Sequence, residues 1–564
     1  MTNTPGSHAG NFPLPSAGHR AAVASTTGLV TILAWVLLLS PVHALEKTSW
    51  KFTFTGQGKT GYTAIGPTNV YATANGYGFD FGFNSVVKYT PSKDGIEGKV
   101  AGKNAYNWTG LPFYAPKHSA FLFSANVPVG NYEVKITMGS KDSAVKATVR
   151  AEQRRLMIED WTIPVGQTET RVIHVNRRKK GTSLTTREQD YIDLDDRLSI
   201  EFNGDHPVLT ELEITKVDTD ITVYLAGNST VVDQPQEPWS TWGANFPRFF
   251  KGGVAISDQA ESGLSAQSFV GARLDNILST IKAGDYVFVE FGHNDAKDAT
   301  ATANFSANLT TFATKVKAKG GTTVLVTPTA RNLWTGTTPD NSLLADFVAK
   351  MKTVAAAQAI DYLDLNAAAV SFLQSLTPTN SKKAYCYFPA NTVPGQTTAL
   401  ADGTHWNDYG GYELAKWMAT AVKAKKLGFA KYLADDHVDF DPSKPDAYAT
   451  FGLPFSPFLD TTFTPPDSAV GPSVHVLPGD IESKTLLRSA SIRDGEVDLE
   501  LEGEVVGTEI RLFAADGSLE ASRLLGSGAS AMQRIGLGQG AAHGIHVLKI
   551  ERDGHLLDSK VLQP

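Results

Sequence analysis

The chain has 564 residues, too many for a single hydrophobic core, so the sequence predicts several domains. Its formal net charge is −7, from 51 basic and 58 acidic side chains, and no long basic run is present. This charge pattern argues against nucleic acid as a partner. Cys386 is the single cysteine, so an intrachain disulfide is excluded.

Residues 1–44 have the pattern of a signal peptide. Arg20 provides a sparse positive region, residues 28–39 form an apolar run, and a cleavage site follows at Ala44. The run is shorter than the ~20 residues that a transmembrane helix needs, and no later stretch could span a bilayer. We therefore expect a secreted or cell-surface protein, with an uncleaved anchor as the alternative. An exported protein without disulfides indicates a bacterial source.

Residues 46–219 show the pattern of an all-β domain. Apolar and polar residues alternate in several short segments, and turns rich in Gly, Asn and Asp separate them. The clearest segments are 51–54, 132–138, 144–150, 197–202 and 209–216. This pattern predicts a β-sandwich.

Residues 220–435 change to short apolar strands that alternate with helical segments. The predicted strands are 221–226, 254–257, 286–291, 323–327 and 362–365. The predicted helices are 241–250, 266–282, 303–319, 342–358 and 408–425. This order predicts a three-layer, flavodoxin-like α/β domain with a parallel sheet, whose active site lies beyond the carboxyl ends of the strands.

The last part of the chain divides into a linker and a small domain. Residues 436–488 are rich in proline and have little periodicity, which predicts a linker. Residues 489–564 return to strand alternation around three Asp-Gly dipeptides, which favour hairpin turns. We predict a small β-sandwich tail, and its hairpin pattern is weakly similar to the sorting tails of some exported proteins.

Three short polar segments of the α/β domain carry candidate catalytic residues. Ser229 directly follows the first predicted strand, and His293, Asn294 and Asp295 follow the strand 286–291. Asp402 precedes His405 by three residues, just before the last helix. Taken alone, each segment is also compatible with a structural turn.

These residue types are those of a serine hydrolase, in which a histidine activates the serine and a carboxylate orients the histidine. His293 and His405 are the only histidines between residues 221 and 425. His405 has Asp402 nearby, whereas Asp295 could orient His293 in an alternative pairing. The spacing of His293, Asp402 and His405 fits no standard zinc pattern, so no metal or cofactor is expected.

Four blocks resemble the motifs of the SGNH (GDSL-type) hydrolase superfamily: GNST at 227–230, SGLS at 262–265, GHND at 292–295 and DGTH at 402–405. The resemblance covers residues 221–425. It implies Ser229 as nucleophile and Asp402 and His405 as its triad partners. It also implies an oxyanion hole from the backbone N–H groups of Ser229 and Gly263 and the side chain of Asn294. Asn228 stands where the family usually has Asp.

Longer stretches around these blocks resemble the rhamnogalacturonan acetylesterase branch, including GDYVFVEFGHND and DGTHWNDYG. The all-β domain is similar to the galactose-binding-like modules that are often fused to such enzymes, so we expect it to assist polysaccharide binding. The expected activity is removal of O-acetyl groups from a plant polysaccharide, rhamnogalacturonan or other pectin. The alternatives are a xylan acetylesterase and a carbohydrate-binding or adhesin protein with a degenerate esterase domain.

Four further residues are candidates for contacts with the sugar. Flat aromatic rings stack on sugar rings, and a guanidinium can bind the carboxylate of galacturonate. The candidates are Trp239, Trp242, Arg331 and Trp334. We expect at least one of the two tryptophans after Ser229 to pack in the core instead.

Overall fold

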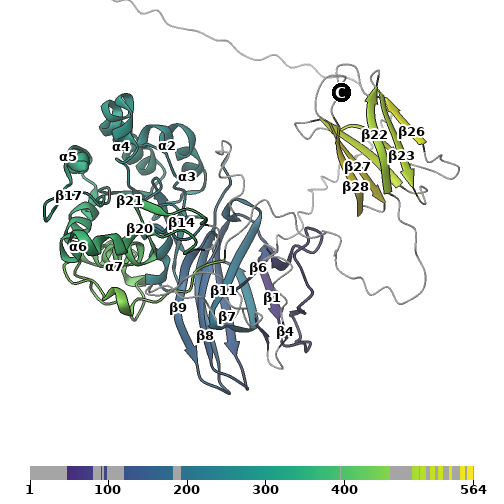
Figure 1. The fold of residues 1–564 in the computed structure, drawn as a ribbon, viewed down its shortest axis with the longest axis horizontal. Coiled ribbons are helices and arrows are strands. Elements are labelled where there is room, and N and C mark those ends of the chain that lie inside the picture. Colours follow the sequence, from purple (N-terminus) through teal and green to yellow (C-terminus); the bar gives the residue numbers. More distant parts are fainter. Residues whose placement is uncertain are drawn as a thin grey trace, which may run out of the picture. The chain divides into compact units, whose positions relative to one another are not determined.

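The computed structural model describes residues 47–80, 90–91, 95–97, 120–181, 192–393 and 396–457, and the strand backbones between 486 and 562. The predicted signal peptide, residues 1–44, lies outside the described residues. The chain divides into two compact units, with the division after Pro466 (Figure 1).

The first part of the larger unit consists of two β-sheets. One sheet has the order β10-β7-β12-β1-β2, with β5 paired to β12 and β4 paired to β5, and the other has the order β3-β6-β11-β8-β9. The bounds are β1 Ser49–Thr53, β2 Thr63–Ala64, β3 Tyr77–Asp80, β4 Thr90–Pro91, β5 Ile96–Glu97, β6 Phe121–Asn126, β7 Gly130–Gly139, β8 Val145–Ala151, β9 Arg155–Ile163, β10 Thr168–Arg177, β11 Arg197–His206 and β12 Val208–Lys216. Alternate residues of β7, Val134, Ile136 and Met138, are fully buried in a core that both sheets share. This is the β-sandwich that the period-two alternation predicts.

The second part is a parallel sheet with the strand order β14-β13-β15-β16-β19. The bounds are β13 Ile221–Ala226, β14 Val254–Asp258, β15 Tyr286–Val289, β16 Thr322–Val326 and β19 Asp361–Leu363. The sequence order and the sheet order differ because the chain winds first to one side of β13 and then to the other. The predicted flavodoxin-like α/β fold is confirmed.

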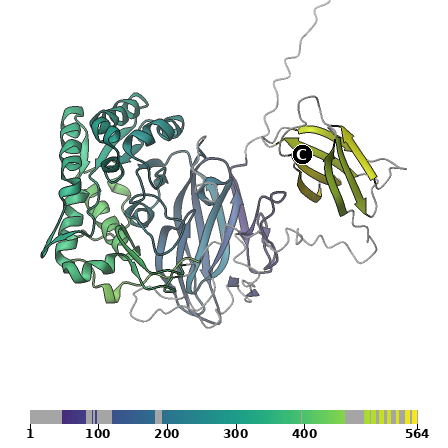
Figure 2. The ribbon, with the colours of Figure 1, turned by 45° about the horizontal axis from the view of Figure 1, so that its top comes forward.

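Helices cover both faces of this sheet (Figure 2). Their bounds are α1 Trp242–Asn245, α2 Ala266–Ala272, α3 Leu274–Thr280, α4 Ala299–Ala318, α5 Ser342–Gln358, α6 Leu365–Asn380 and α7 Asp408–Ala424. Val223 and Leu225 of β13 pack in the core shared with α1, α6 and α7. Tyr224 and Ala226 pack in the core shared with α2 to α5. Both faces of the strand are therefore apolar, as expected for a buried parallel sheet.

Some elements differ from the sequence-based prediction. The single helix predicted over 266–282 is two helices, α2 and α3, which meet at the buried Arg273. Helix α6 was not predicted, nor was the antiparallel pair β20 (Tyr385–Phe388) and β21 (Leu400–Trp406). Most of β21 is only half-buried and polar, so it lacks the alternation that indicates a strand.

Residues 436–457, predicted as the first part of a linker, belong to the larger unit, and the end of this segment is buried in it. The side chains of Leu453, Phe455 and Ser456 are buried, and the backbone carbonyls of Pro454 and Phe455 accept hydrogen bonds from Arg150 and Asn203. A high proline content indicates that a segment has little regular secondary structure, but such a segment can still pack against the rest of the protein. We call residues 451–457 the strap.

The smaller unit contains two antiparallel sheets, β22-β23-β26 and β25-β24-β27-β28. The bounds are β22 Leu486–Arg493, β23 Glu496–Glu502, β24 Thr508–Ala514, β25 Leu519–Leu524, β26 Met532–Gly536, β27 His546–Arg552 and β28 His555–Leu562. The strands on either side of each Asp-Gly dipeptide pair antiparallel, as predicted. Within the described residues, no helix has both the length and the hydropathy that crossing a membrane requires.

Candidate active site

Ser229 lies in a tight turn that follows the carboxyl end of β13. The carbonyl of Asn228 accepts hydrogen bonds from the backbone N–H groups of Val231 and Val232, each at 3.0 Å. A Cβ atom on Gly227 would lie 2.5 Å from the Val231 side chain, so this turn requires glycine there. The Ser229 carbonyl accepts a hydrogen bond of 2.8 Å from Gln234 Nε2. The backbone of the serine is thus fixed from two sides.

Asp402 and His405 both lie on β21. Oδ1 of Asp402 accepts hydrogen bonds from the backbone N–H groups of Thr404 and His405, at 2.8 and 3.1 Å. Oδ2 of Asp402 is 2.6 Å from His405 Nδ1, and His405 Nε2 is 2.8 Å from Ser229 Oγ. The three side chains therefore form one continuous hydrogen-bonded chain.

The protonation of this chain follows from the carboxylate. Burial raises the pKa of Asp402, but the hydrogen bond and charge of His405, with the two backbone N–H groups, outweigh burial and lower that pKa to about 2. An ionised carboxylate only accepts hydrogen bonds, so Nδ1 of His405 carries the proton and Nε2 is the acceptor. Nε2 is therefore oriented to take the proton from Ser229 Oγ.

Gly263 and Asn294, the other predicted oxyanion-hole residues, lie in loops after β14 and β15. Gly263 has a φ of 87°, in the left-handed region that favours glycine, and a Cβ there would meet no atom within 4 Å. Asn294 Nδ2 donates a hydrogen bond of 3.1 Å to the Leu264 carbonyl, which ties the two loops together. Nδ2 carries a second hydrogen for another acceptor. Within the described part of the chain, no hydrogen bond occupies the backbone N–H of Ser229 or Gly263.

His293 does not contact Ser229. It is buried, its Nε2 is 3.5 Å from Thr329 Oγ1, and its Nδ1 accepts a hydrogen bond of 3.3 Å from Arg331 Nε. Burial and the charge of Arg331 lower the pKa of His293 to about 3. The Asp295 carboxylate instead accepts hydrogen bonds from the backbone N–H groups of Ala266 and Gly292. The alternative pairing of His293 with Asp295 is therefore not formed.

The four predicted sugar contacts have different surroundings. Trp242 is 1% exposed and its indole N–H donates to Glu290, so its prediction as a sugar contact is wrong. Trp239 is half-buried and donates a long hydrogen bond of 3.4 Å to Asp402 Oδ2. Trp334 is half-buried in the short hairpin β17–β18 (Trp334–Thr335 and Thr338–Pro339) and donates to Asn332. Arg331 is half-buried, and burial lowers its pKa while Asp402 raises it.

The sequence analysis missed two features of this site. Gln234 supports the nucleophile from a loop that carries no motif, and only its position five residues after Ser229 hinted at it. Asn228 accepts hydrogen bonds through Oδ1 from the backbone N–H and hydroxyl of Thr230, whereas its buried Nδ2 has no partner in the described structure.

Among the described residues, no cluster of His, Cys, Asp and Glu could hold a metal ion.

A hydrogen-bonded Ser229–His405–Asp402 chain beyond the strand ends of a flavodoxin-like sheet is the arrangement of a GDSL-type hydrolase. Residues 225–414 match the profile of the GDSL-like lipase/acylhydrolase family. RhgT, a rhamnogalacturonan acetylesterase of Bacillus subtilis, is 32% identical over 218 residues, 38% of this chain and 94% of that protein. The chain belongs to this family and is a GDSL-like esterase or acylhydrolase.

Two other relatives extend the comparison. YxiM, an uncharacterized esterase of Bacillus subtilis, is 26% identical over 361 residues, 61% of this chain and 86% of that protein. A rhamnogalacturonan acetylesterase of Emericella nidulans is 28% identical over 224 residues, 34% of this chain and 87% of that protein.

Proposed function

We propose that the protein is a carbohydrate esterase that removes O-acetyl groups from plant cell-wall polysaccharide, with rhamnogalacturonan as the first candidate substrate. The observation that carries the proposal is the His405 Nε2 contact of 2.8 Å with Ser229 Oγ, backed by Asp402. The similarity to relatives named rhamnogalacturonan acetylesterases supports the substrate class.

The proposed reaction proceeds through an acetyl-enzyme. Ser229 Oγ attacks the acetyl carbonyl while His405 Nε2 accepts its proton, and His405 then returns that proton to the departing sugar hydroxyl. A water molecule, activated in the same way, hydrolyses the acetyl-serine and releases acetate. The N–H groups of Ser229 and Gly263 and the Asn294 amide are proposed to stabilise the oxyanion, and losing one such donor typically costs about 3 kcal/mol.

We propose that Arg331 binds the carboxylate of a galacturonate residue. Its Nε is taken by His293, whereas its terminal nitrogens have no partner in the described structure. A guanidinium binds a carboxylate through two parallel hydrogen bonds, and a neutral xylan offers no such group. Trp239 and Trp334 remain candidates for stacking on the sugar.

The decisive test measures acetate release from acetylated rhamnogalacturonan, homogalacturonan and xylan, with Ser229→Ala as the control. We expect the highest kcat/KM on rhamnogalacturonan and no release by Ser229→Ala. Arg331→Ala should lower kcat/KM about tenfold on the pectic polymers, the scale of one lost charged hydrogen bond, but not on xylan. A folded Ser229→Ala variant with the wild-type rate would contradict the mechanism, and a preference for xylan would contradict the substrate.

We also propose export of the protein, supported by the apolar run at residues 28–39 and the small-residue site at Ala44. To test this, the protein is expressed in a bacterial host, and the mass of the protein found in the medium is measured. A secreted form that begins at Leu45 is expected, whereas an intact amino terminus on the mature protein would favour the membrane anchor.

A further inference from the structure

The β-sandwich reaches into the α/β part through the turn between β8 and β9. Glu152, Gln153 and Arg154 form this turn, and all three side chains are buried although turn residues are usually exposed. Glu152 and Arg154 have φ angles of 53° and 64°, a left-handed conformation that is uncommon for residues other than glycine. Buried polar side chains in this conformation indicate that tertiary contacts fix the turn.

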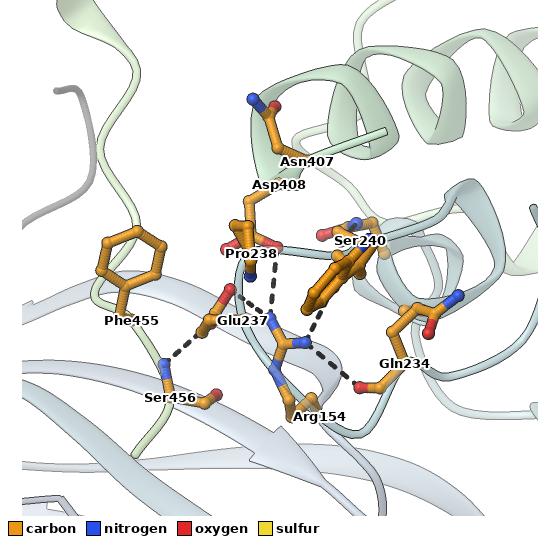
Figure 3. A network of polar contacts seen from close by, with 12 residues as sticks. Arg154, Gln234, Glu237, Pro238, Ser240, Asn407, Asp408, Phe455 and Ser456 are labelled. Atoms are coloured by element: carbon orange, nitrogen blue, oxygen red, sulfur yellow. Dashed lines mark hydrogen bonds and ion pairs between the residues drawn. The ribbon is translucent and has the colours of Figure 1, made fainter. Parts of the chain in front are cut away.

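Arg154 makes four contacts with the α/β part (Figure 3). Its Nη1 donates to the carbonyls of Gln234, at 3.1 Å, and Trp239, at 2.8 Å. Its Nη2 is 2.5 Å from Glu237 Oε2 and 3.6 Å from Asp408 Oδ1. One guanidinium therefore joins the loop 234–239 to the amino-terminal end of α7.

Three of these four partners, Gln234, Trp239 and Asp408, are linked to a member of the triad. Gln234 Nε2 donates to the Ser229 carbonyl, and Trp239 Nε1 donates to Asp402 Oδ2. Asp408 is the first residue of α7 and follows His405 by three positions. The backbone N–H of Ser240 also donates to the Trp406 carbonyl at 2.9 Å, so the two loops are in direct contact.

From these contacts we infer that Arg154 of the β-sandwich is a positioning residue for the catalytic triad. It touches neither substrate nor reacting atoms, and it acts through Gln234, Trp239 and Asp408. The inference rests on the proposed esterase function and assigns to the β-sandwich a role in catalysis beyond polysaccharide binding.

The contacts between Arg154, the loop 234–239 and α7 require an arginine side chain. Its planar group donates in several directions at fixed angles, whereas the ammonium of lysine is a single point charge on a flexible chain. Arg154 also supplies the positive charge between the carboxylates of Glu237 and Asp408, which are both buried. Lysine at this position would preserve the charge but could not hold both carbonyls and both carboxylates in place.

The test compares Arg154→Lys and Arg154→Ala with Arg150→Ala as the matched control. Arg150 lies in the same β8–β9 hairpin and is equally buried, but it contacts Glu201 and the strap carbonyl of Pro454 instead of the loop 234–239. The readouts are kcat and KM for p-nitrophenyl acetate, rescue by millimolar guanidinium, and the NMR resonance of the His405 Nδ1 proton shared with Asp402.

Arg154→Lys is expected to lower kcat about 10- to 100-fold with little change in KM, the effect of a misplacement near 1 Å at a catalytic group. Guanidinium should restore part of the kcat of Arg154→Ala but not alter Arg150→Ala. The His405 resonance should shift in both Arg154 variants and stay in place in the control. Because Arg154→Ala leaves two buried carboxylates unpaired, Arg154→Lys decides the matter if the alanine variant does not fold.

Wild-type kcat and an unshifted His405 resonance in folded Arg154→Lys would overturn the inference. Parallel losses in Arg154→Lys and Arg150→Ala, with a shifted resonance in both, would also overturn it and leave a purely structural role. If the wild-type protein hydrolyses no acetyl ester, the proposed function is wrong, and the His405 resonance still decides whether Arg154 positions the triad.

Discussion

His405 and His293 lie close to each other but have different partners. His405 lies between Ser229 and Asp402, in reach of both, whereas His293 lies between Thr329 and Arg331. With its pKa lowered to about 3, His293 is neutral at physiological pH, and in the described part of the chain no carboxylate contacts it. His293 therefore supports the loop that carries Asn294, and His405 is the candidate base.

We predict that His405→Ala lowers kcat by several orders of magnitude, because among the described residues His405 is the one group hydrogen-bonded to Ser229 Oγ. Asp402→Asn should slow acylation with little effect on substrate binding, because it disturbs the tautomer of His405 and removes the charge that stabilises the imidazolium. Steady-state kinetics with p-nitrophenyl acetate provide the measurement. His293→Ala is the matched control, and a loss equal to that of His405→Ala would contradict this division of roles.

Glu290, directly after β15, is a fully buried carboxyl group with a raised pKa. Burial raises the pKa of Glu290 to about 7, against the hydrogen bonds from Trp242, Thr230 and Thr329, which lower it. The single hydroxyl hydrogen of Thr230 faces two oxygens, Asn228 Oδ1 at 2.9 Å and Glu290 Oε1 at 2.8 Å. The Thr230 hydroxyl therefore shares its hydrogen between Asn228 and Glu290.

Glu290→Gln is expected to flatten the pH dependence of stability. An unfolded glutamate has a pKa near 4.3, so between about pH 4.3 and 7 folding of the wild-type protein takes up a proton at Glu290. Wild-type stability therefore falls as pH rises through this window, by about 3 kcal/mol in total, and glutamine, which mimics the protonated carboxyl, removes that loss. Thermal unfolding of both proteins from pH 4 to 8 measures the difference, and parallel curves would contradict the raised pKa of Glu290.

Among the elements, the strap shows how an irregular segment can join two regular ones. The Ser456 backbone N–H donates to Glu237 Oε1 at 2.9 Å, and the Ser456 hydroxyl contacts Glu201 Oε2 of β11, also at 2.9 Å. The strap therefore contacts both the β-sandwich and the loop after Ser229. Its partner in that loop, Glu237, is also a partner of Arg154.

A chain that ends at residue 446 is expected to unfold at a temperature roughly 10 °C lower than a chain that ends at residue 466. Removing the buried side chains of Leu453 and Phe455 costs about 5 kcal/mol or more, and the strap's polar partners are left exposed or unpaired. Thermal unfolding of both truncations checks this. Equal melting temperatures would mean that residues 447–466 behave as the linker that their composition predicts.

At the scale of the whole molecule, the β-sandwich and the α/β part form one compact unit. Charged side chains cross their boundary in buried pairs, such as Arg155 with Asp233 at 2.6 Å. Breaking a buried ion pair by removing one partner typically costs 3–5 kcal/mol. The sandwich is therefore integral to the fold of the catalytic part, in addition to any binding of polysaccharide.

Deletion of residues 46–219 is expected to abolish activity on p-nitrophenyl acetate as well as on polymer, because it exposes the boundary and removes the support of the triad. Acetate release and small-ester hydrolysis, measured together, provide the test. Deletion of residues 467–564, a separate unit, is the control and should leave small-ester kinetics unchanged. A sandwich-deleted protein that loses activity on polymer alone would restore the simpler binding role.

The sequence by itself determined the elements whose pattern is local. Alternation in β7 and apolar runs such as β13 follow from which faces are buried, so the sandwich and the parallel sheet were predictable. Ser229 and the Asp402–His405 pair were predictable because their blocks resemble the GDSL-type motifs, and because strand ends in such a sheet meet at one edge.

Only the tertiary structure decided the rest, because burial and partners depend on residues far apart in the chain. Trp239 and Trp242 look alike in sequence, yet Trp242 packs in the core and Trp239 faces Asp402. Residues 451–457 look like a linker, yet they are buried by surfaces assembled from both parts of the unit. Arg154 lies 75 positions before Ser229, in a turn of the β-sandwich, and no sequence pattern links them. Their connection exists because folding buries one guanidinium between two active-site loops.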